Sequence, residues 1–304
     1  MSLLIVGTIA FDSLETPHGN ADRVIGGSCQ YSSYAASYFT DDIRLVSIIG
    51  DDFPQSELDD LVRQGASLEG VKIVPGGKSF FWAGRYLDNM NDRVTLTTDL
   101  NVLADFDPIL PDSYKDSEYI LLANLTPDIQ ISVINQLAKK PKLVVLDTMN
   151  FWIESAHDKL MQAIKLCDVL TINDEEARMI SGEHSLVKAA SKIFDLGPKY
   201  LIIKKGEHGC LLFDRDNVFF APAMPLEKVT DPTGAGDCFA GGFLGYIAKT
   251  GDTSFENLKR ALVYGSAAAS FVVEDFSNYN IKNLSEDRFQ QRVADFVKLS
   301  QYSL

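Results

Sequence analysis

The sequence predicts an α/β protein in which helices cover both faces of a mostly parallel sheet. Six short apolar runs are continuous rather than alternating, as in strands buried on both faces: 3–6, 45–49, 119–123, 143–146, 169–172 and 200–203. Segments with helical periodicity lie between them: 28–39, 53–64, 129–139, 155–165, 174–180 and 186–196. This alternation is typical of parallel strands joined by crossover helices. Past residue 237 the chain is mostly helical, at 238–249, 254–272 and 286–300.

Two segments depart from this alternation. Residues 76–100 contain two strand-like runs, 78–86 and 92–99, joined by a polar turn at 88–91. Residues 12–25 supply another strand pair. We expect both segments to form a small sheet that acts as a lid or a dimer contact. The predicted organisation is one α/β domain made of 1–11, 28–75 and 101–304, with an inserted β lid made of 12–27 and 76–100.

Composition limits the classes of function. The chain has 304 residues, a net charge of −14, 46% hydrophobic residues and 23% charged residues, as in an ordinary enzyme. The acidic balance argues against a general nucleic-acid binder, which needs a basic stripe, and against docking on anionic membranes. An acidic protein that binds a polyanion must do so with local devices such as backbone amides, a few cations and a metal ion.

The cysteines indicate a reducing compartment. Cys29, Cys167, Cys210 and Cys238 form no C-x-x-C pair, and the four histidines are scattered, so we expect free thiols and no structural zinc. The first apolar run is short and has no basic residues before it, unlike a secretory signal. No apolar run reaches 18 residues, so we expect no membrane span and a cytoplasmic protein.

The most informative motif is D-P-T-G-A-G-D at 231–237, followed at once by an apolar helix-like run. Gly234 and Gly236 let backbone amides point into a concavity, and a helix N-terminus adds unpaired N–H groups with partial positive charge. Such a site holds a phosphate or a developing anion. Asp237 would repel phosphate, and its presence makes sense if it takes a proton from an attacking hydroxyl.

Two plainer structures could also produce this motif. One is a turn into a helix with an aspartate cap. The other is a dinucleotide fingerprint, which fails because G-x-G-x-x-G requires glycine where Phe239 stands and should follow the first strand. The complete string is far more specific than a glycine pair.

The string resembles the D-T/P-x-G-A-G-D signature of the ribokinase and phosphofructokinase-B family of sugar and nucleoside kinases. The resemblance implies a ribokinase-like three-layer α/β/α fold with a small β lid, and transfer of the γ-phosphoryl group of ATP to an alcohol. It implies Asp237 as the base, with the amides of Gly234, Ala235 and Gly236 stabilising the phosphoryl oxygens. It also implies Mg²⁺, and a K⁺ site near Asp231 and Thr233.

Three further segments match the nucleotide side of that family. Asn173 and Glu176 fit an N-x-x-E motif, which organises magnesium through water in that family, although the residues taken alone favour a helix cap. Lys204, Gly206 and Gly209 resemble a K/T-x-G-x-x-G loop lying against the nucleotide, and they also suit the turn of a hairpin. The small-residue stretch around Ser266 resembles the helix that lines the adenine pocket, or it is ordinary helix packing.

The acceptor side begins with Asp12, which keeps the G-x-x-x-x-D spacing of the family and, by that resemblance, accepts hydrogen bonds from two hydroxyls. By composition alone it is a solvated loop acid just as well. Gly26 and Gly27 resemble the family's paired glycines, which let the backbone approach the acceptor. Tyr31 stands where the family often has asparagine, and this departure indicates an acceptor of different shape from ribose.

Three asparagines follow or end predicted strands, where open α/β sheets place ligands: Asn101, Asn124 and Asn150. Each is also an ordinary turn residue. Four aromatic residues gather in the predicted lid, either as core or dimer contact or as a cover for an aromatic part of the acceptor: Phe80, Phe81, Trp82 and Tyr86.

The expected activity is therefore an ATP- and Mg²⁺-dependent kinase, with K⁺ as a further cofactor. We expect a sugar or sugar-like alcohol as acceptor and a nucleoside as the alternative. A non-catalytic sensor of a nucleotide or sugar is the hypothesis from another class, which an intact Asp237 disfavours. We expect neither nucleic acid nor membrane as a partner, and a homodimer formed through the lid.

Overall fold

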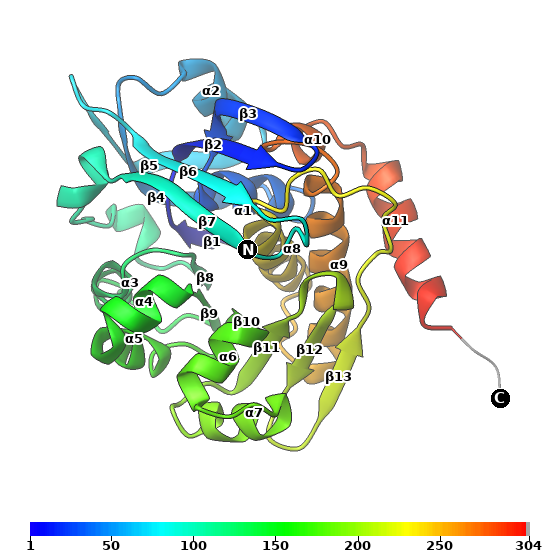
Figure 1. Cartoon of the computed structure of the whole chain (residues 1–304). Helices are drawn as coiled ribbons and strands as arrows, with labels where there is room; N and C mark the ends of the chain where they lie inside the picture. The colour runs from blue at the N-terminus through cyan, green and yellow to red at the C-terminus, as the bar shows by residue number, and fades with distance from the viewer. Residues whose placement is uncertain (302–304) are drawn as a thin grey trace.

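The computed structural model describes residues 1–301, arranged as a large sheet between two helical layers with a small sheet at one end (Figure 1). The strands of the large sheet are β1 (Leu3–Val6), β4 (Ile43–Gly50), β5 (Ala66–Val74), β8 (Tyr119–Leu122), β9 (Leu143–Asp147), β10 (Val169–Asn173), β11 (Tyr200–Lys204), β12 (Cys210–Phe213) and β13 (Val218–Ala221). They follow the order β13-β12-β11-β10-β9-β8-β1-β4-β5. The pairs β11–β12 and β12–β13 are antiparallel, and the remaining pairs are parallel.

The two faces of the large sheet carry separate hydrophobic clusters. Leu3 and Ile5 of β1 belong to one cluster and Leu4 and Val6 to the other, and all four are fully buried. Helices on the first face are α1 (Ser28–Ala36), α2 (Gln55–Arg63), α8 (Ala235–Thr250), α9 (Phe255–Val272), α10 (Tyr279–Lys282) and α11 (Glu286–Leu299). Helices on the second are α3 (Pro127–Asn135), α4 (Asn150–Ser155), α5 (His157–Ile164), α6 (Asp174–Ser181) and α7 (Leu186–Phe194). This is the expected three-layer α/β/α arrangement.

The apolar runs of the sequence are strands in the structure, so that prediction is confirmed. The structure adds β5, whose only buried residue is Ala66, and β13, whose only buried residue is Ala221. β5 mixes polar and apolar residues and has no continuous apolar run to reveal it, whereas β13 is a short apolar run, VFFA, that was not assigned as a strand. Some helix predictions were wrong in their bounds: the expected 28–39 helix ends at Ala36, the expected 129–139 helix ends at Asn135, and the expected 155–165 helix starts at His157.

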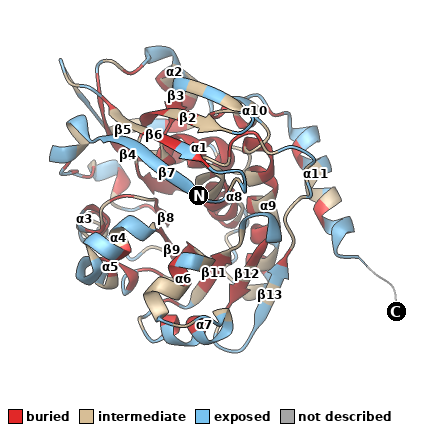
Figure 2. Ribbon diagram, viewed as in Figure 1, coloured by how far each residue is buried: buried red, intermediate tan, exposed pale blue. Residues whose placement is uncertain are grey.

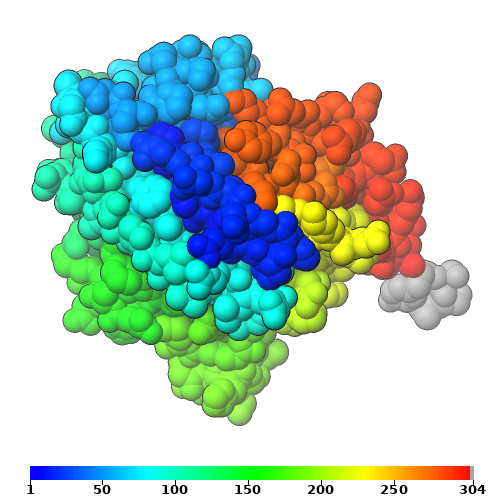
Figure 3. Space-filling view, turned by 45° about the horizontal axis from the view of Figure 1, so that its top comes forward, coloured from blue at the N-terminus to red at the C-terminus, as the bar shows by residue number. Residues whose placement is uncertain are grey.

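The small sheet has the order β3-β2-β6-β7 and is formed by β2 (Ala10–Thr16), β3 (Gly19–Gly26), β6 (Phe80–Tyr86) and β7 (Arg93–Asp99). The expected strand pairs within 12–25 and 76–100 are thus confirmed. β2 and β6 pair in parallel, which brings the two segments together. β7 is an edge strand and is exposed along its whole length (Figure 2). Figure 3 shows this sheet, in dark blue and cyan, beside the yellow segment that leads toward residue 231.

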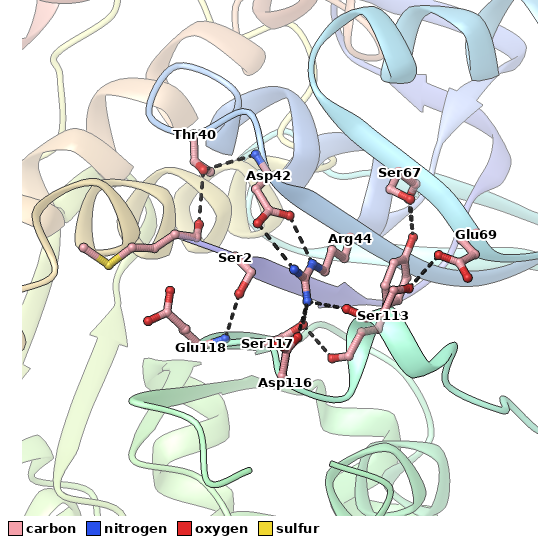
Figure 4. Close-up of polar contacts among 12 residues, drawn as sticks. Ser2, Thr40, Asp42, Arg44, Ser67, Glu69, Ser113, Asp116, Ser117 and Glu118 are labelled. Atoms are coloured by element: carbon pink, nitrogen blue, oxygen red, sulfur yellow. Dashed lines mark hydrogen bonds and ion pairs between the residues drawn. The ribbon is translucent and has the colours of Figure 1, made fainter. Parts of the chain in front are cut away.

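The amino ends of the parallel strands are held by a polar network around Arg44 (Figure 4). Arg44 donates to the Asp42 carboxylate at 3.0 Å, to the Asp116 carboxylate at 2.9 Å and to the Ser113 carbonyl at 2.6 Å. Tyr114, next to Ser113, donates to the Ser67 carbonyl of β5 at 2.8 Å. These contacts hold the segment before β8 against β4 and β5. The polar groups that make them are hydrogen-bonded to one another.

Within residues 1–301, no helix is both long and apolar enough to cross a membrane. Over the same residues, all four cysteines are buried and unpaired.

Candidate active site

The anion loop, residues 231–237, leads into α8, as the sequence predicts. Gly234 is the N-cap, with φ of 78° in the left-handed region that favours glycine. An ideal Cβ on Gly234 would lie 2.6 Å from ring atoms of Tyr31, so the buried tyrosine ring lies directly against this turn. Only glycine therefore fits at this position without a shift of the chain.

The first turn of α8 supplies backbone donors. The Cys238 amide closes the helix onto the Gly234 carbonyl at 2.8 Å, and the Ala235 amide donates to the Pro232 carbonyl at 3.2 Å. Within the described part of the chain, no such partner is found for the amides of Gly234 and Gly236. These two amides are therefore available to an anion, whereas that of Ala235 is partly used by the turn.

Asp237 is the third residue of α8 and is partly exposed. The pKa of its carboxyl group is raised to about 7, because burial and, to a smaller extent, the Asp147 carboxylate outweigh the opposing Lys204 and Arg93 cations. A carboxyl with a pKa near neutrality takes up a proton more readily than an ordinary aspartate does. This position beside free amides suits a general base that faces an electrophile.

Lys204 ends β11 and lies over the anion loop. Its Nζ is 2.9 Å from a carboxylate oxygen of Asp147 at the end of β9, and 3.3 Å from an ideal Cβ on Gly236. Burial lowers the pKa of Lys204, but the carboxylates of Asp147, Glu176 and Asp237 outweigh it, so the pKa is raised and the ammonium stays charged. The Lys204 ammonium thus lies beside the Gly236 amide, where it can bind the same anion as the amides at the start of α8.

Asn173 and Glu176 form a capping box at the start of α6. The Glu176 amide donates to Asn173 Oδ1 at 2.8 Å, and the Asn173 amide donates to Glu176 Oε2 at 2.7 Å. Burial raises the pKa of Glu176 to about 7, Lys204 opposes this rise, and Asp147 adds to it. The cap interpretation therefore holds, and Glu176 also lies within the electrostatic reach of the Lys204–Asp147 pair.

The nucleotide loop, residues 204–209, is the turn of the β11–β12 hairpin, as the plainer interpretation predicts. Gly206 and Gly209 have positive φ of 55° and 79°. Ser266 of α9 lies near the start of β12, with Oγ 3.8 Å from Cys210 Sγ. An open cavity of about 400 Å³ adjoins this loop and is lined by Lys205, Glu207, His208, Phe220, Pro222 and Ala223.

Asp12 lies in β2 against the paired glycines. An ideal Cβ on Gly26 would lie 2.0 Å from Asp12 Oδ2, so only glycine leaves room for this carboxyl group. Gly27, with φ of 99°, is the N-cap of α1. Burial raises the pKa of Asp12 to about 8, and the charges of Asp231 and Asp237 add to the effect. Asp12 therefore lies within the electrostatic reach of both ends of the anion loop.

Tyr31 is almost fully buried, and its hydroxyl has no hydrogen-bond partner within residues 1–301. Burial raises its pKa, as do the nearby carboxylates of Asp12 and Asp231. The Tyr31 ring packs against Gly234, and its assignment to the acceptor stays a prediction.

Asp231 is fully buried at the start of the anion loop. Its Oδ1 accepts from the Thr233 amide at 2.9 Å, whereas the buried Oδ2 has no partner among the described residues. Thr233 Oγ1 donates to the hydroxyl of Tyr86 at 3.1 Å. Burial raises the pKa of Asp231 to about 6.

The three asparagines make mainly local contacts. Asn101 has φ of 48° and donates to the Ser79 carbonyl at 2.9 Å. Asn124 Oδ1 accepts from the indole of Trp152 at 3.0 Å. Asn150 is exposed and begins α4, where its side chain accepts from the next amide at 3.0 Å. Their assignment to the acceptor stays a prediction.

Two residues of the site were missed by sequence reasoning. Asp147 ends β9, and the signal for it was its place at the carboxyl end of a buried strand. Tyr86 was assigned only to an aromatic cluster, and nothing in the sequence places its hydroxyl on Thr233.

Comparisons with known proteins bear on the family and the fold of the chain. Residues 9–283 match the model of the pfkB family carbohydrate kinases. The chain is similar to a cytidine kinase of Thermococcus kodakarensis, with 30% identity over 250 residues that span 80% of this chain and 87% of the relative. Among solved structures it resembles a Burkholderia thailandensis nucleoside kinase in complex with inosine, with a TM-score of 0.74, 23% identity and 100% of both chains covered. It also resembles an E. coli putative ribokinase II in complex with ATP and Mg²⁺, with a TM-score of 0.79, 17% identity, and 98% and 99% covered.

Proposed function

The chain belongs to the pfkB family of carbohydrate kinases, and we propose that it transfers the γ-phosphoryl group of ATP to a hydroxyl of a nucleoside. The family makes it a phosphotransferase with a hydroxyl acceptor. The nucleoside was the alternative from sequence, with a sugar first. The cytidine kinase and the inosine-bound nucleoside kinase now favour the nucleoside, but the observation that carries the choice lies in the small sheet.

That observation is the pairing of Asp12 in β2 with Trp82 in β6. Register partners in parallel strands share a face, so the indole lies on the same side of the small sheet as the Asp12 carboxyl group. Gly84, the next residue on that face of β6, leaves room for the indole, because an ideal Cβ there would lie 2.1 Å from Trp82 Cη2. A carboxylate that holds ribose hydroxyls beside an aromatic face that stacks on a base suits a nucleoside better than a free sugar.

In the proposed reaction, Asp237 takes the proton of the acceptor hydroxyl as its oxygen attacks the γ-phosphorus. The bond between the γ-phosphorus and the oxygen that bridges to the β-phosphate breaks, and ADP leaves with that electron pair. The amides of Gly234 and Gly236 and the Lys204 ammonium stabilise the negative charge on the phosphoryl oxygens. The chain therefore contributes mainly positioning and charge stabilisation.

The donor groups suit the cations implied by the family. Within residues 1–301 no cluster of three or more His, Cys, Asp or Glu is suited to holding a metal ion. This fits Mg²⁺, which is held mostly by water and substrate phosphates, with Glu176 acting through water. Mg²⁺ would neutralise phosphate charge when bound. The buried, unpartnered Oδ2 of Asp231 fits a desolvated K⁺ ion, with Thr233 beside it.

In this proposal the small sheet serves both as a lid and as a dimer contact. The α/β domain consists of 1–11, 28–75 and 101–304, and the inserted sheet consists of 12–27 and 76–100. The exposed edge strand β7 carries Val94 and Leu96, which are 50% and 44% exposed. Edge strands with exposed apolar side chains favour pairing with another chain. The molecular mass in solution, measured by light scattering, tests this part.

A panel of acceptors tests the function directly. ADP release is measured with cytidine, uridine, adenosine, inosine, ribose and fructose, each with ATP and Mg²⁺. The proposal expects turnover with at least one nucleoside, a KM for it below that for ribose, and a selective rise of this KM in Trp82→Ala. Stacking on an aromatic ring contributes about 1–3 kcal/mol per base, so the KM should rise roughly 5- to 150-fold. Efficient turnover of a sugar alone, unaffected by Trp82→Ala, contradicts the choice of acceptor.

A further inference from the structure

The turn between β6 and β7 touches both loops of the active site. Tyr86, the last residue of β6, is 7% exposed, and its hydroxyl accepts from Thr233 Oγ1 of the anion loop at 3.1 Å. Five residues later, in the turn itself, Asn91 lies against the nucleotide loop, because an ideal Cβ on Gly206 would be 2.7 Å from Asn91 Oδ1. The small sheet therefore contacts the phosphoryl-transfer side of the site and not just the acceptor side.

This turn is internally braced. The Leu87 amide donates to the Asp92 carbonyl at 2.9 Å, and the Met90 amide donates to the Leu87 carbonyl at 2.9 Å. Asn89 Oδ1 accepts from the amides of Asn91 and Asp92 at 3.1 and 3.0 Å. Because these bonds leave the backbone of the turn little freedom, the tip of the turn moves together with strands β6 and β7.

Thr233 is held at two points. Its amide donates to Asp231 Oδ1 at 2.9 Å, and its hydroxyl donates to Tyr86. The next residue is Gly234, whose left-handed conformation sets the direction of the first α8 amides. A β-branched side chain has few rotamers, so fixing its hydroxyl also fixes the backbone that carries it. A single hydrogen bond thus links the Tyr86 hydroxyl to Thr233, the residue before Gly234, and so to the backbone of the anion loop.

We propose that Tyr86 is a positioning residue, through which the small sheet holds the anion loop in the geometry that phosphoryl transfer requires. This inference rests on the proposed kinase function and extends it, because it makes the donor half of the site depend on the sheet that covers the acceptor. When the sheet moves away, the Tyr86–Thr233 bond is lost and the amides of the loop are less preorganised. Transfer to water without an acceptor is thereby disfavoured.

The test is a double-mutant cycle with Tyr86→Phe and Thr233→Val, which remove the two hydroxyls with little change in shape. A neutral hydrogen bond contributes about 0.5–1.5 kcal/mol, which corresponds to roughly a 2- to 12-fold loss of kcat in Tyr86→Phe, with the KM for ATP changed less than about twofold. In the Thr233→Val background, Tyr86→Phe should have no further effect on kcat. Independent effects that multiply, or an unchanged kcat in Tyr86→Phe, overturn the proposal.

Hydrogen–deuterium exchange gives a readout that does not depend on knowing the acceptor. Amides of residues 231–237 should exchange faster in Tyr86→Phe than in the wild type. The matched control is Tyr114→Phe, which removes another buried hydroxyl, bonded to Ser67 at the opposite end of the sheet, and should change neither exchange in 231–237 nor kcat. Unchanged exchange in Tyr86→Phe refutes the positioning role, whereas failure of the proposed acceptor shows only in the acceptor panel.

Discussion

Replacing Gly234 by alanine perturbs the anion loop at its most constrained residue. Gly234 has φ of 78°, and an alanine in this left-handed conformation is destabilised by about 1–2 kcal/mol. Its Cβ would also lie 2.6 Å from three ring atoms of Tyr31, whose ring is 1% exposed and has no room to move aside. Overpacking in a buried site typically costs about 1–3 kcal/mol. Together these terms lower the free energy of unfolding by roughly 2–5 kcal/mol.

Urea unfolding measures this loss as a lower midpoint at an unchanged slope. The matched control is Gly236→Ala, two residues further on, where α8 is regular and the nearest atom is the flexible Lys204 Nζ at 3.3 Å. We expect this control to lower the free energy of unfolding by less than about 1 kcal/mol. In a Tyr31→Ala background, the steric contribution to the destabilisation by Gly234→Ala should disappear, and the contribution from the left-handed backbone should remain. Equal losses for the two glycines, or no relief in that background, refute the described geometry.

Two further predictions concern the raised pKa values. Lys204→Met removes a cation that lowers the pKa of Asp237, so the rise of kcat/KM with pH, centred near pH 7 in the wild type, should move to higher pH; an unmoved midpoint counts against Asp237 as the titrating base. The folded-state pKa of Asp12 is raised from 3.8 to about 8, so the wild type loses stability as pH rises between these values. Asp12→Asn should therefore raise Tm relative to the wild type at pH 8 and have little effect below pH 4, and equal shifts at both pH values contradict the burial of an ionisable group there.

Much of the fold follows from local pattern. Continuous apolar runs identify strands such as β1 because both of their faces are buried, and the small sheet is visible because its strands interrupt the helical segments. β5 escaped prediction since Ala66 is its only buried residue, so the strand depends on pairing with β4 rather than on a pattern of its own. The break between α4 and α5 at Ala156 likewise has no glycine or proline to announce it.

The candidate site, like the fold, could be predicted only where its residues are neighbours in the sequence. The anion loop is contiguous in sequence, so its glycines and Asp237 could be found without a structure. Contacts between distant segments could not be found in this way: the buried Tyr31 ring lies against Gly234, 203 positions away. The Lys204–Asp147 pair joins the ends of strands separated by 57 positions, and only the sheet order brings them together.

The most direct test of the account is single-turnover phosphoryl transfer by Asp237→Asn, with ATP binding measured by calorimetry on the same protein. The account predicts that the Kd for ATP changes little and that transfer to the best nucleoside of the panel falls by roughly 10²- to 10⁴-fold, the usual scale for a lost general base. Transfer at the wild-type rate would show that Asp237 is not the base and would contradict the central claim.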